Sequence, residues 1–354
     1  MQLPTWISPG VLYSSHLVAI GKGFYTGTLR ALITLFLVVT AAVGGWAAWV
    51  VHAPVTPPAN TSLLLHSGYS TRRIAAELKK AGVIRNELAF RIWHWAHPKP
   101  SLKAGEYRFE RAATLPQVYG RIARGDIYFH VVTIPEGYTM FDIAQAMEDA
   151  GLGSASDFLR VAETQTQLVS DFAPEAKSLE GYLFPNTYQF TRTQSLEEMA
   201  AEMVHQFRQV AQQIGLSADV PRVVTMASIV EKETAAAEER PRVASVYYNR
   251  LGLKMALDAD PSVIYAEQLT GTYSGSLHHA DLAVKSPYNT YRFAGLPPGP
   301  IANPGKSALE AAMHPDRTNF LYFVSDGNGH HRFARNLEEH NRNVNAYRRA
   351  VGMR

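Results

Sequence analysis

Residues 221–249, PRVVTMASIVEKETAAAEERPRVASVYYN, decide how the larger part of this 354-residue chain is interpreted. Pro221 suits the first turn of a helix, where its missing N–H would have no partner in any case. At about 100° per residue, Val224, Ala227 and Glu231 fall within one narrow arc of that helix. The stretch therefore predicts a helix on which Glu231 lies at the boundary between a broad apolar face and a narrow polar face.

A carboxyl group at that seam would be partly desolvated, which raises its pKa and suits a general acid that works near neutral pH. Ser228 and Lys232 mark the polar edge. Lys232 would lower the pKa of Glu231, but it projects roughly a right angle away, so we expect burial to dominate. Glu233 falls on the far side, where it would pair with a cation or brace the helix. Most helical glutamates are solvated, so this stretch alone leaves a surface role open.

The composition excludes several classes of function. Hydrophobic residues make up 46% of the chain and charged residues 18%, with a net charge of +3, so a sizeable core can be buried. No Lys/Arg-rich block is present, which disfavours a nucleic-acid partner. The absence of cysteine excludes disulfides, thiolate metal sites and a cysteine nucleophile. The histidine pairs at 278–279 and 330–331 lack the spacing of metal ligands, so no metal or cofactor is expected.

Residues 31–51, ALITLFLVVTAAVGGWAAWVV, predict a single transmembrane helix, because an uncharged run of this length spans the hydrocarbon core. Trp46 and Trp49 stand near one end, where indole favours the membrane interface. Lys22 and Arg30 flank the other end, which places the N-terminus in the cytoplasm and the bulk of the chain outside the inner (plasma) membrane. A cleaved signal peptide is the alternative, but the run is long and starts late.

Four further segments complete the expected organisation. Residues 1–30 form a cytoplasmic tail, and residues 52–61, with three prolines, form a short stiff linker. Residues 62–128 form a small α+β module, and residues 129–354 form a larger mixed α+β domain. The expected fold class is therefore α+β behind a membrane helix.

A weak internal repeat links the two outer segments. Ser70 and Gly82 in the first correspond to Thr139 and Gly151 in the second, 69 residues later. Each copy predicts a strand, a helix capped by Ser or Thr, and a glycine that ends the helix. The same order of elements is common in small α+β units, but the matching spacing favours a duplication. Further on, residues 196–214 predict one amphipathic helix.

Several loop-like windows combine tyrosine with asparagine, which suits sugar recognition because aromatic faces pack on pyranose rings and amides bond hydroxyl groups. The windows are 178–188, 257–265, 285–305 and 321–341. A plain scaffold rich in turns is the alternative. The candidate substrate-binding residues are Ser228, Glu233, Asn186, Tyr188, Asp260, Tyr288, Asn289, Thr290, Tyr291 and Asn303.

Taken in order, these windows resemble the YceG-like (MltG) family of endolytic peptidoglycan lytic transglycosylases from about residue 130 to the C-terminus. Asn186 stands where aspartate is expected, Ala259 where serine or threonine is expected, and the stretch before the membrane helix is longer than usual. Residues 62–128 resemble the LysM-like module of wall-binding proteins. The motifs that carry the two resemblances are LEGYLFPNTY, ASIVEKET, RVASVYYNRL, LDADPSVIY, SPYNTY, GLPPGPIANPG, AAMHPD and LYFVSDGNGHHRF, and, for the module, a GYS turn and LKAGEYRF.

The resemblance implies an enzyme that cleaves the bond between MurNAc and GlcNAc in nascent glycan strands, leaving 1,6-anhydroMurNAc ends. Glu231 would be its single acid/base. We infer separately, from the dipoles of their side chains, that Tyr288, Asn289 or Thr290 would support the positive charge at C1. Peptidoglycan synthases are candidate partners. Two rivals stay open: a non-catalytic wall-binding scaffold, and a hydrolytic muramidase for which Asp260 is the best second carboxylate.

Overall fold

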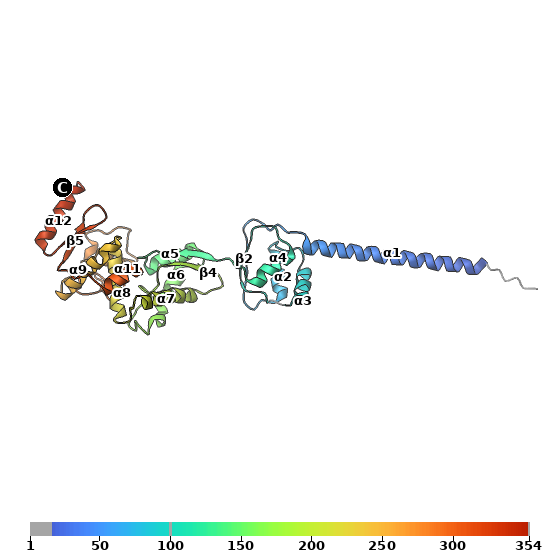
Figure 1. Cartoon of the computed structure of the whole chain (residues 1–354), viewed down its shortest axis with the longest axis horizontal. Coiled ribbons are helices and arrows are strands. Elements are labelled where there is room, and N and C mark those ends of the chain that lie inside the picture. Colours follow the sequence, from blue (N-terminus) through green and yellow to red (C-terminus); the bar gives the residue numbers. More distant parts are fainter. Residues whose placement is uncertain (1–15, 99–100, 353–354) are drawn as a thin grey trace, which may run out of the picture. The chain divides into compact units, whose positions relative to one another are not determined.

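The computed structural model describes residues 16–98 and 101–352, with side chains in the first helix described from residue 27 onward. The chain divides into two compact units, Met1–Ile127 and Tyr128–Arg354. Both mix helices with short antiparallel strands, as Figure 1 shows, so the α+β fold class is confirmed. Of the expected cytoplasmic tail, residues 1–15 lie outside the described residues.

The small unit has five short elements after a long N-terminal helix. Its strands β1 and β2 pair antiparallel, with Leu63 opposite Tyr107. A core of apolar side chains, among them Leu78, Phe90 and Ile122, lies between this ribbon and the helices. The elements are α1 (His16–His52), β1 (Thr61–Leu65), α2 (Thr71–Lys80), α3 (Glu87–Ala96), β2 (Gly105–Phe109) and α4 (Leu115–Arg124).

Helix α1 contains an apolar stretch, Gly27–His52, that is long enough to cross a membrane. At about 1.5 Å per residue, its 26 residues exceed the roughly 30 Å of a hydrocarbon core. The most apolar part of this stretch is not covered by the rest of the protein, which fits a lipid-facing helix better than a core helix. The residues that follow are held to the small unit through an isolated bridge between Val55 and Ala113.

The large unit is mainly helical, with two antiparallel two-stranded ribbons, β3–β4 and β5–β6. The predicted helix over 196–214 is confirmed as α7, which begins at a capping box formed by Ser195 and Glu198. The elements are β3 (His130–Thr133), α5 (Met140–Asp149), α6 (Ala155–Thr164), η1 (Thr166–Val169), β4 (Thr187–Phe190), α7 (Leu196–Gln213), α8 (Val220–Glu233), η2 (Ala237–Glu239), α9 (Arg240–Gly252), α10 (Asp260–Thr270), η3 (Asp281–Ala283), α11 (Lys306–Met313), β5 (Tyr322–Ser325), β6 (His331–Ala334) and α12 (Leu337–Ala350).

The repeat seen in the sequence has the same local structure in both units. Ser70 caps α2 and Thr139 caps α5, each by accepting a hydrogen bond from the third residue of its helix. Gly82 and Gly151 follow these helices with φ of +70° and +68°, a conformation that costs glycine little. In both units a second helix comes next, and a later strand pairs with the first.

Candidate active site

Helix α8 is the centre of the large unit, and its last turn carries both glutamates of the EKE sequence. Pro221 lies in its first turn, as predicted. Every residue from 224 to 230 is buried, because α9, α10 and α11 all pack against this helix. The face opposite the predicted apolar arc is therefore also covered: Met226 and Ile229 are fully buried. Glu231 and Glu233, about 200° apart on the helix, point into two different environments.

Glu231 lies in a buried ion pair. Its side chain is 5% exposed, and Arg240 Nη2 donates to Oε1 at 2.6 Å. The backbone N–H of Gly305, at the N-terminal end of α11, donates to Oε2 at 3.0 Å. Burial raises the pKa of Glu231, in the direction that the sequence predicted, while the Gly305 hydrogen bond and the Arg240 charge oppose that rise. Both carboxylate oxygens are thus occupied by groups that favour the charged form.

Glu233 is surrounded by protein but borders an open cavity of about 360 Å³. Burial raises the pKa of Glu233 to about 7. A hydrogen bond from Tyr247 and the charge of Arg250 pull it down, and the charge of Asp260 pushes it further up. As the last residue of α8, Glu233 also sits at the negative end of the helix, which disfavours a carboxylate. A protonated carboxyl near neutral pH therefore faces a space large enough for part of a ligand.

Two fixed polar clusters form the wall of this cavity. Tyr291 donates to Asp260 Oδ1 at 2.5 Å, at the first residue of α10. Arg250 donates to Asp258 Oδ2 at 2.9 Å and to the carbonyl of Leu321 at 2.7 Å. The sequence predicted both Asp260 and Tyr291 as site residues, and the structure brings them to the same cavity as Glu233.

His340 is a member of the cavity wall that sequence reasoning did not identify. Among the described residues its Nδ1 is buried without a hydrogen-bond partner, and its ring stacks on Tyr322 with centroids 5.1 Å apart. Burial lowers the pKa of His340, with the charge of Arg250 acting in the same direction, so the ring is neutral at pH 7. The window 321–341 was interpreted as a loop, whereas His340 lies on α12. The sequence feature that could have identified His340 is a histidine in a helical segment that follows the aromatic strand β5.

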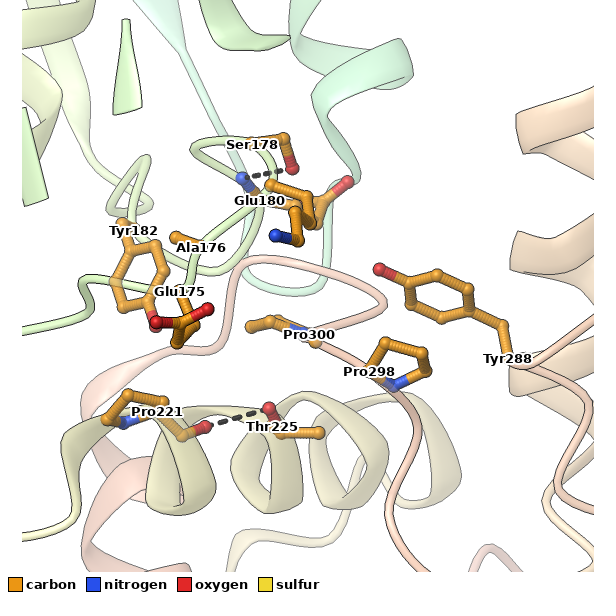
Figure 2. A pocket seen from close by; sticks show the side chains of 12 residues that line it. Glu175, Ala176, Ser178, Glu180, Tyr182, Pro221, Thr225, Tyr288, Pro298 and Pro300 are labelled. Carbon is orange, nitrogen blue, oxygen red and sulfur yellow. Dashed lines mark hydrogen bonds between the residues drawn. The ribbon is translucent and has the colours of Figure 1, made fainter. Parts of the chain in front are cut away.

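The loops of windows 178–188 and 285–305 meet around Glu180, while the end of the second window, at Gly305, bonds Glu231. Figure 2 shows Tyr288 with its hydroxyl turned toward Glu180, and Pro298 and Pro300 between them and α8. The cavity there is about 70 Å³, too small for a disaccharide. The cavity between the two loops therefore lies at Glu180, and the groove expected beside Glu231 stays a prediction.

Glu180 itself is 2% exposed and acts as a hydrogen-bond hub. Its two oxygens accept from the Met140 N–H at 2.9 Å and from Asn303 Nδ2 at 2.7 Å. Burial raises the pKa of Glu180 to about 8, and the Met140 and Tyr265 hydrogen bonds pull it down. Asn303 also accepts from the Leu183 N–H at 2.9 Å, which ties the two loops together.

Several other candidates form hydrogen bonds within the protein, and their contact with sugar stays a prediction. Ser228 accepts from the Ile301 N–H at 3.0 Å, and Thr290 accepts from the Ala259 N–H at 2.9 Å. Asn186 is exposed, and its side-chain carbonyl accepts from the next backbone N–H. The candidates whose side chains are buried are Ser228, Asn289, Thr290, Asn303 and Tyr188.

The fold and this cavity define the class of protein. A carboxyl whose pKa is raised toward neutrality, on an open cavity that two aspartates and three tyrosines also line, is typical of a general-acid enzyme that cleaves glycosidic bonds. Binding alone would not require the carboxyl to keep its proton near pH 7. The comparisons with known proteins agree with this class.

Residues 63–346 match the model of the YceG-like family, and the chain belongs to that family. It is 34% identical over 316 residues to the endolytic murein transglycosylase of Bacillus subtilis, covering 83% of this chain and 87% of the relative. It is 30% identical over 315 residues to the protein of the same name from Streptococcus pneumoniae D39, covering 78% of this chain and 56% of that longer relative. The crystal structure of a YceG-like protein from Listeria monocytogenes matches with a TM-score of 0.53 and 33% identity, over 79% of this chain and 98% of that one.

Proposed function

We propose that this chain is an endolytic lytic transglycosylase that cleaves the MurNAc–GlcNAc bond of peptidoglycan strands and leaves 1,6-anhydroMurNAc ends. The observation that carries the proposal is the glutamic acid with a pKa of about 7 at the 360 Å³ cavity, in a chain of the YceG-like family. The shared name of the relatives from Bacillus and Streptococcus supports the reaction. An open cavity beside a desolvated acid favours an enzyme over a wall-binding scaffold.

Glu233 is the better candidate for the acid/base than Glu231, the residue that the sequence predicts. An acid must hold a proton and reach the substrate. Each oxygen of Glu231 already accepts a hydrogen bond, one from a guanidinium at 2.6 Å and one from a backbone N–H at 3.0 Å, and both bonds favour the charged form. Glu233 borders the cavity, and its pKa is raised to about 7. Glu231 then holds the end of α8 in place.

In the proposed reaction one carboxyl serves twice. The Glu233 proton passes to the glycosidic oxygen as the bond from C1 of MurNAc to that oxygen breaks. The 6-hydroxyl of the same MurNAc attacks C1, and its proton passes to the Glu233 carboxylate. One C–O bond is broken and one is formed, so neither water nor a cofactor is consumed, and the acid is regenerated.

Asp260 has a clear place in this scheme. It carries a hydrogen bond from Tyr291 at 2.5 Å and shares the cavity with Glu233. Its negative charge would stabilise the oxocarbenium-like transition state that forms at C1. A hydrolytic muramidase would use the same residue as nucleophile or base, so the pairing of Glu233 with Asp260 is also what favours that second function.

The proposed setting is the outer face of the inner (plasma) membrane, where nascent strands emerge. The apolar stretch Gly27–His52 supports a single-pass anchor with a cytoplasmic N-terminus and an extracytoplasmic large unit. We interpret residues 62–128 as a LysM-like module that places the strand, because no acid/base candidate stands out there. Peptidoglycan synthases are the proposed protein partners, since they supply uncut strands.

Product analysis tests the reaction. Purified chain is incubated with uncross-linked glycan strands, and the fragments are separated by mass. Transglycosylation gives fragments that end in 1,6-anhydroMurNAc, which are lighter than reducing ends by one water. Reducing ends would establish the muramidase, and the absence of any fragments from a folded, correctly anchored chain would favour the scaffold.

A further inference from the structure

Helix α3 of the small unit carries an apolar stripe that no part of the described fold covers. Leu88, Ile92 and Trp95 are 57%, 55% and 82% exposed. Their spacings of four and three residues place them on one face of the helix. The opposite face is buried in the core of the unit through Phe90, which is fully buried. An exposed stripe of this kind marks a contact with a membrane or another molecule.

The stripe is continuous with the outer end of α1. One apolar cavity of about 260 Å³ is lined by Trp46 and Val50 from α1 and by Leu88 and Ile92 from α3. Val50 is only 5% exposed, because the small unit covers it. Leu88 and Ile92 of the α3 stripe therefore lie beside the tryptophan-bearing end of α1.

The junction between α1 and the small unit is fixed by polar contacts. The Arg85 guanidinium donates to the carbonyls of Ala53 and Pro54, directly after the last turn of α1. It also lies over the indole ring of Trp49, 4.7 Å from the centroid. These contacts hold α3 beside α1 and leave the stripe little freedom to turn away.

We propose that the Leu88–Ile92–Trp95 face of α3 lies in the interface of the lipid bilayer, beside the point where α1 leaves the membrane. The proposal rests on the membrane anchor of the proposed function. The 26-residue stretch of α1 is longer than the hydrocarbon core requires, so its tryptophan-bearing end lies at the headgroup level. Tryptophan prefers that level, and leucine and isoleucine add buried apolar area there. The small unit is then seated on the membrane, and its orientation to the bilayer is set by two elements.

The absence of cysteine from the chain gives a clean test, because one introduced cysteine is a unique labelling site. The full chain, as Ile92→Cys or Trp95→Cys with a nitroxide label, is reconstituted in vesicles of phosphatidylethanolamine and phosphatidylglycerol. Collision of the label with lipid-soluble oxygen is compared with collision with a water-soluble nickel chelate. Phe36→Cys, within the apolar stretch, is the lipid control. Arg108→Cys on β2, on the side of the small unit away from α1 in Figure 1, is the water control.

We expect labels at 92 and 95 to collide more with oxygen than with the chelate, as at 36, and the label at 108 to show the reverse. Labels at 92 and 95 that behave like 108, while 36 stays in lipid, would overturn the proposal and leave the anchor intact. Shielding from both reagents would indicate a protein partner and would also overturn it. A water-exposed label at 36 would show that the anchor itself fails. Unchanged circular dichroism confirms that each variant is folded.

Discussion

Replacing Glu233 with Gln tests the proposed acid most directly. The amide keeps the shape of the side chain and accepts the Tyr247 hydrogen bond, but it has no proton to transfer. With a pKa of about 7, about half of the Glu233 carboxyls hold a proton at pH 7, against about 0.3% at the ordinary value of 4.5. General acid–base catalysis contributes about 10²–10⁴-fold. Since one group would serve both halves of the reaction, we expect the rate to fall by about 10⁴-fold or more.

The same change should not harm stability. The folded-state pKa of Glu233 lies above the ordinary 4.5, so the folded protein holds this proton more tightly than the unfolded chain does. Wild type therefore loses stability as pH rises from about 4.5 to about 7, and the contribution is constant above that range. Glu233→Gln removes this loss. We expect its Tm at pH 8 to equal or exceed that of wild type.

Glu231→Gln is the matched control. It leaves the guanidinium of Arg240, 7% exposed, with only Glu136 at 3.6 Å as a charged partner. Removing one partner of a buried ion pair costs about 3–5 kcal/mol, and Glu136 places this case at about 3. For a unit of about 150–250 residues that cost lowers Tm by about 6–12 °C. Below its own Tm, the Glu231→Gln enzyme should retain most of its activity.

The assay combines release of anhydromuropeptides with a thermal melt of each variant. Our reasoning is refuted if folded Glu233→Gln works at a near-normal rate. It is equally refuted if Glu231→Gln melts like wild type and yet is inactive. The second result would establish Glu231 as the acid, as the sequence alone predicts.

Four further outcomes are expected. Activity on soluble glycan strands should fall about tenfold per pH unit above pH 7, as Glu233 loses its proton, which a pH–rate profile measures. Glu180 has a pKa of about 8 and is mostly protonated at pH 7, so Glu180→Ala, which leaves the Met140 N–H and Asn303 Nδ2 without this acceptor, should lower the free energy of unfolding by about 1–3 kcal/mol in denaturant titrations. Tyr291→Phe removes the hydrogen bond to Asp260 and should lower kcat about tenfold at unchanged Tm, whereas equal kcat would exclude a catalytic role for that pair. His340→Ala removes the unpaired Nδ1 and should raise KM several-fold with kcat retained, which steady-state kinetics can separate.

Local structure was largely predictable from the sequence. The capping residues Ser70 and Thr139, the glycines that end their helices and the apolar stripe over 196–214 all fix backbone geometry within a few residues. Such signals depend on neighbours in the chain, and the structure confirms each of them. The apolar helix after residue 27 was predictable for the same reason, because its length and composition are local properties.

Tertiary neighbours were not predictable in the same way. The helical wheel identified Lys232 as a cation that lowers the pKa of Glu231, and its charge does act in that direction, but its ammonium group donates to the Gly137 carbonyl at 3.2 Å. The cation that pairs with Glu231 is Arg240, which enters from the start of α9. A wheel orders the side chains of one helix and carries no information about which other elements approach it.

The same limit explains why asparagine and threonine in the loops were interpreted as sugar ligands. Asn289 donates to the carbonyls of Leu282 and Val284, and Thr290 bonds Ser262 and Ala259, so their polar groups are used within the protein. A loop has backbone N–H and C=O groups that no helix or sheet pairs, and polar side chains supply their hydrogen-bond partners when the loop is buried. Polar residues in an ordered loop therefore indicate a stable loop as often as a binding surface.

The two glutamates at the end of α8 lie in different environments although they belong to the same helix turn. Residues two apart on a helix point about 200° away from each other, so a single turn places its carboxyls in opposite environments. On one side a guanidinium and the N-terminal end of α11 oppose the rise that burial causes in the pKa of Glu231. On the other side, burial and the charge of Asp260 favour the protonated form of Glu233. In the proposed reaction, the ion pair of Glu231 stabilises the last turn of α8, and that turn places Glu233 at the cavity.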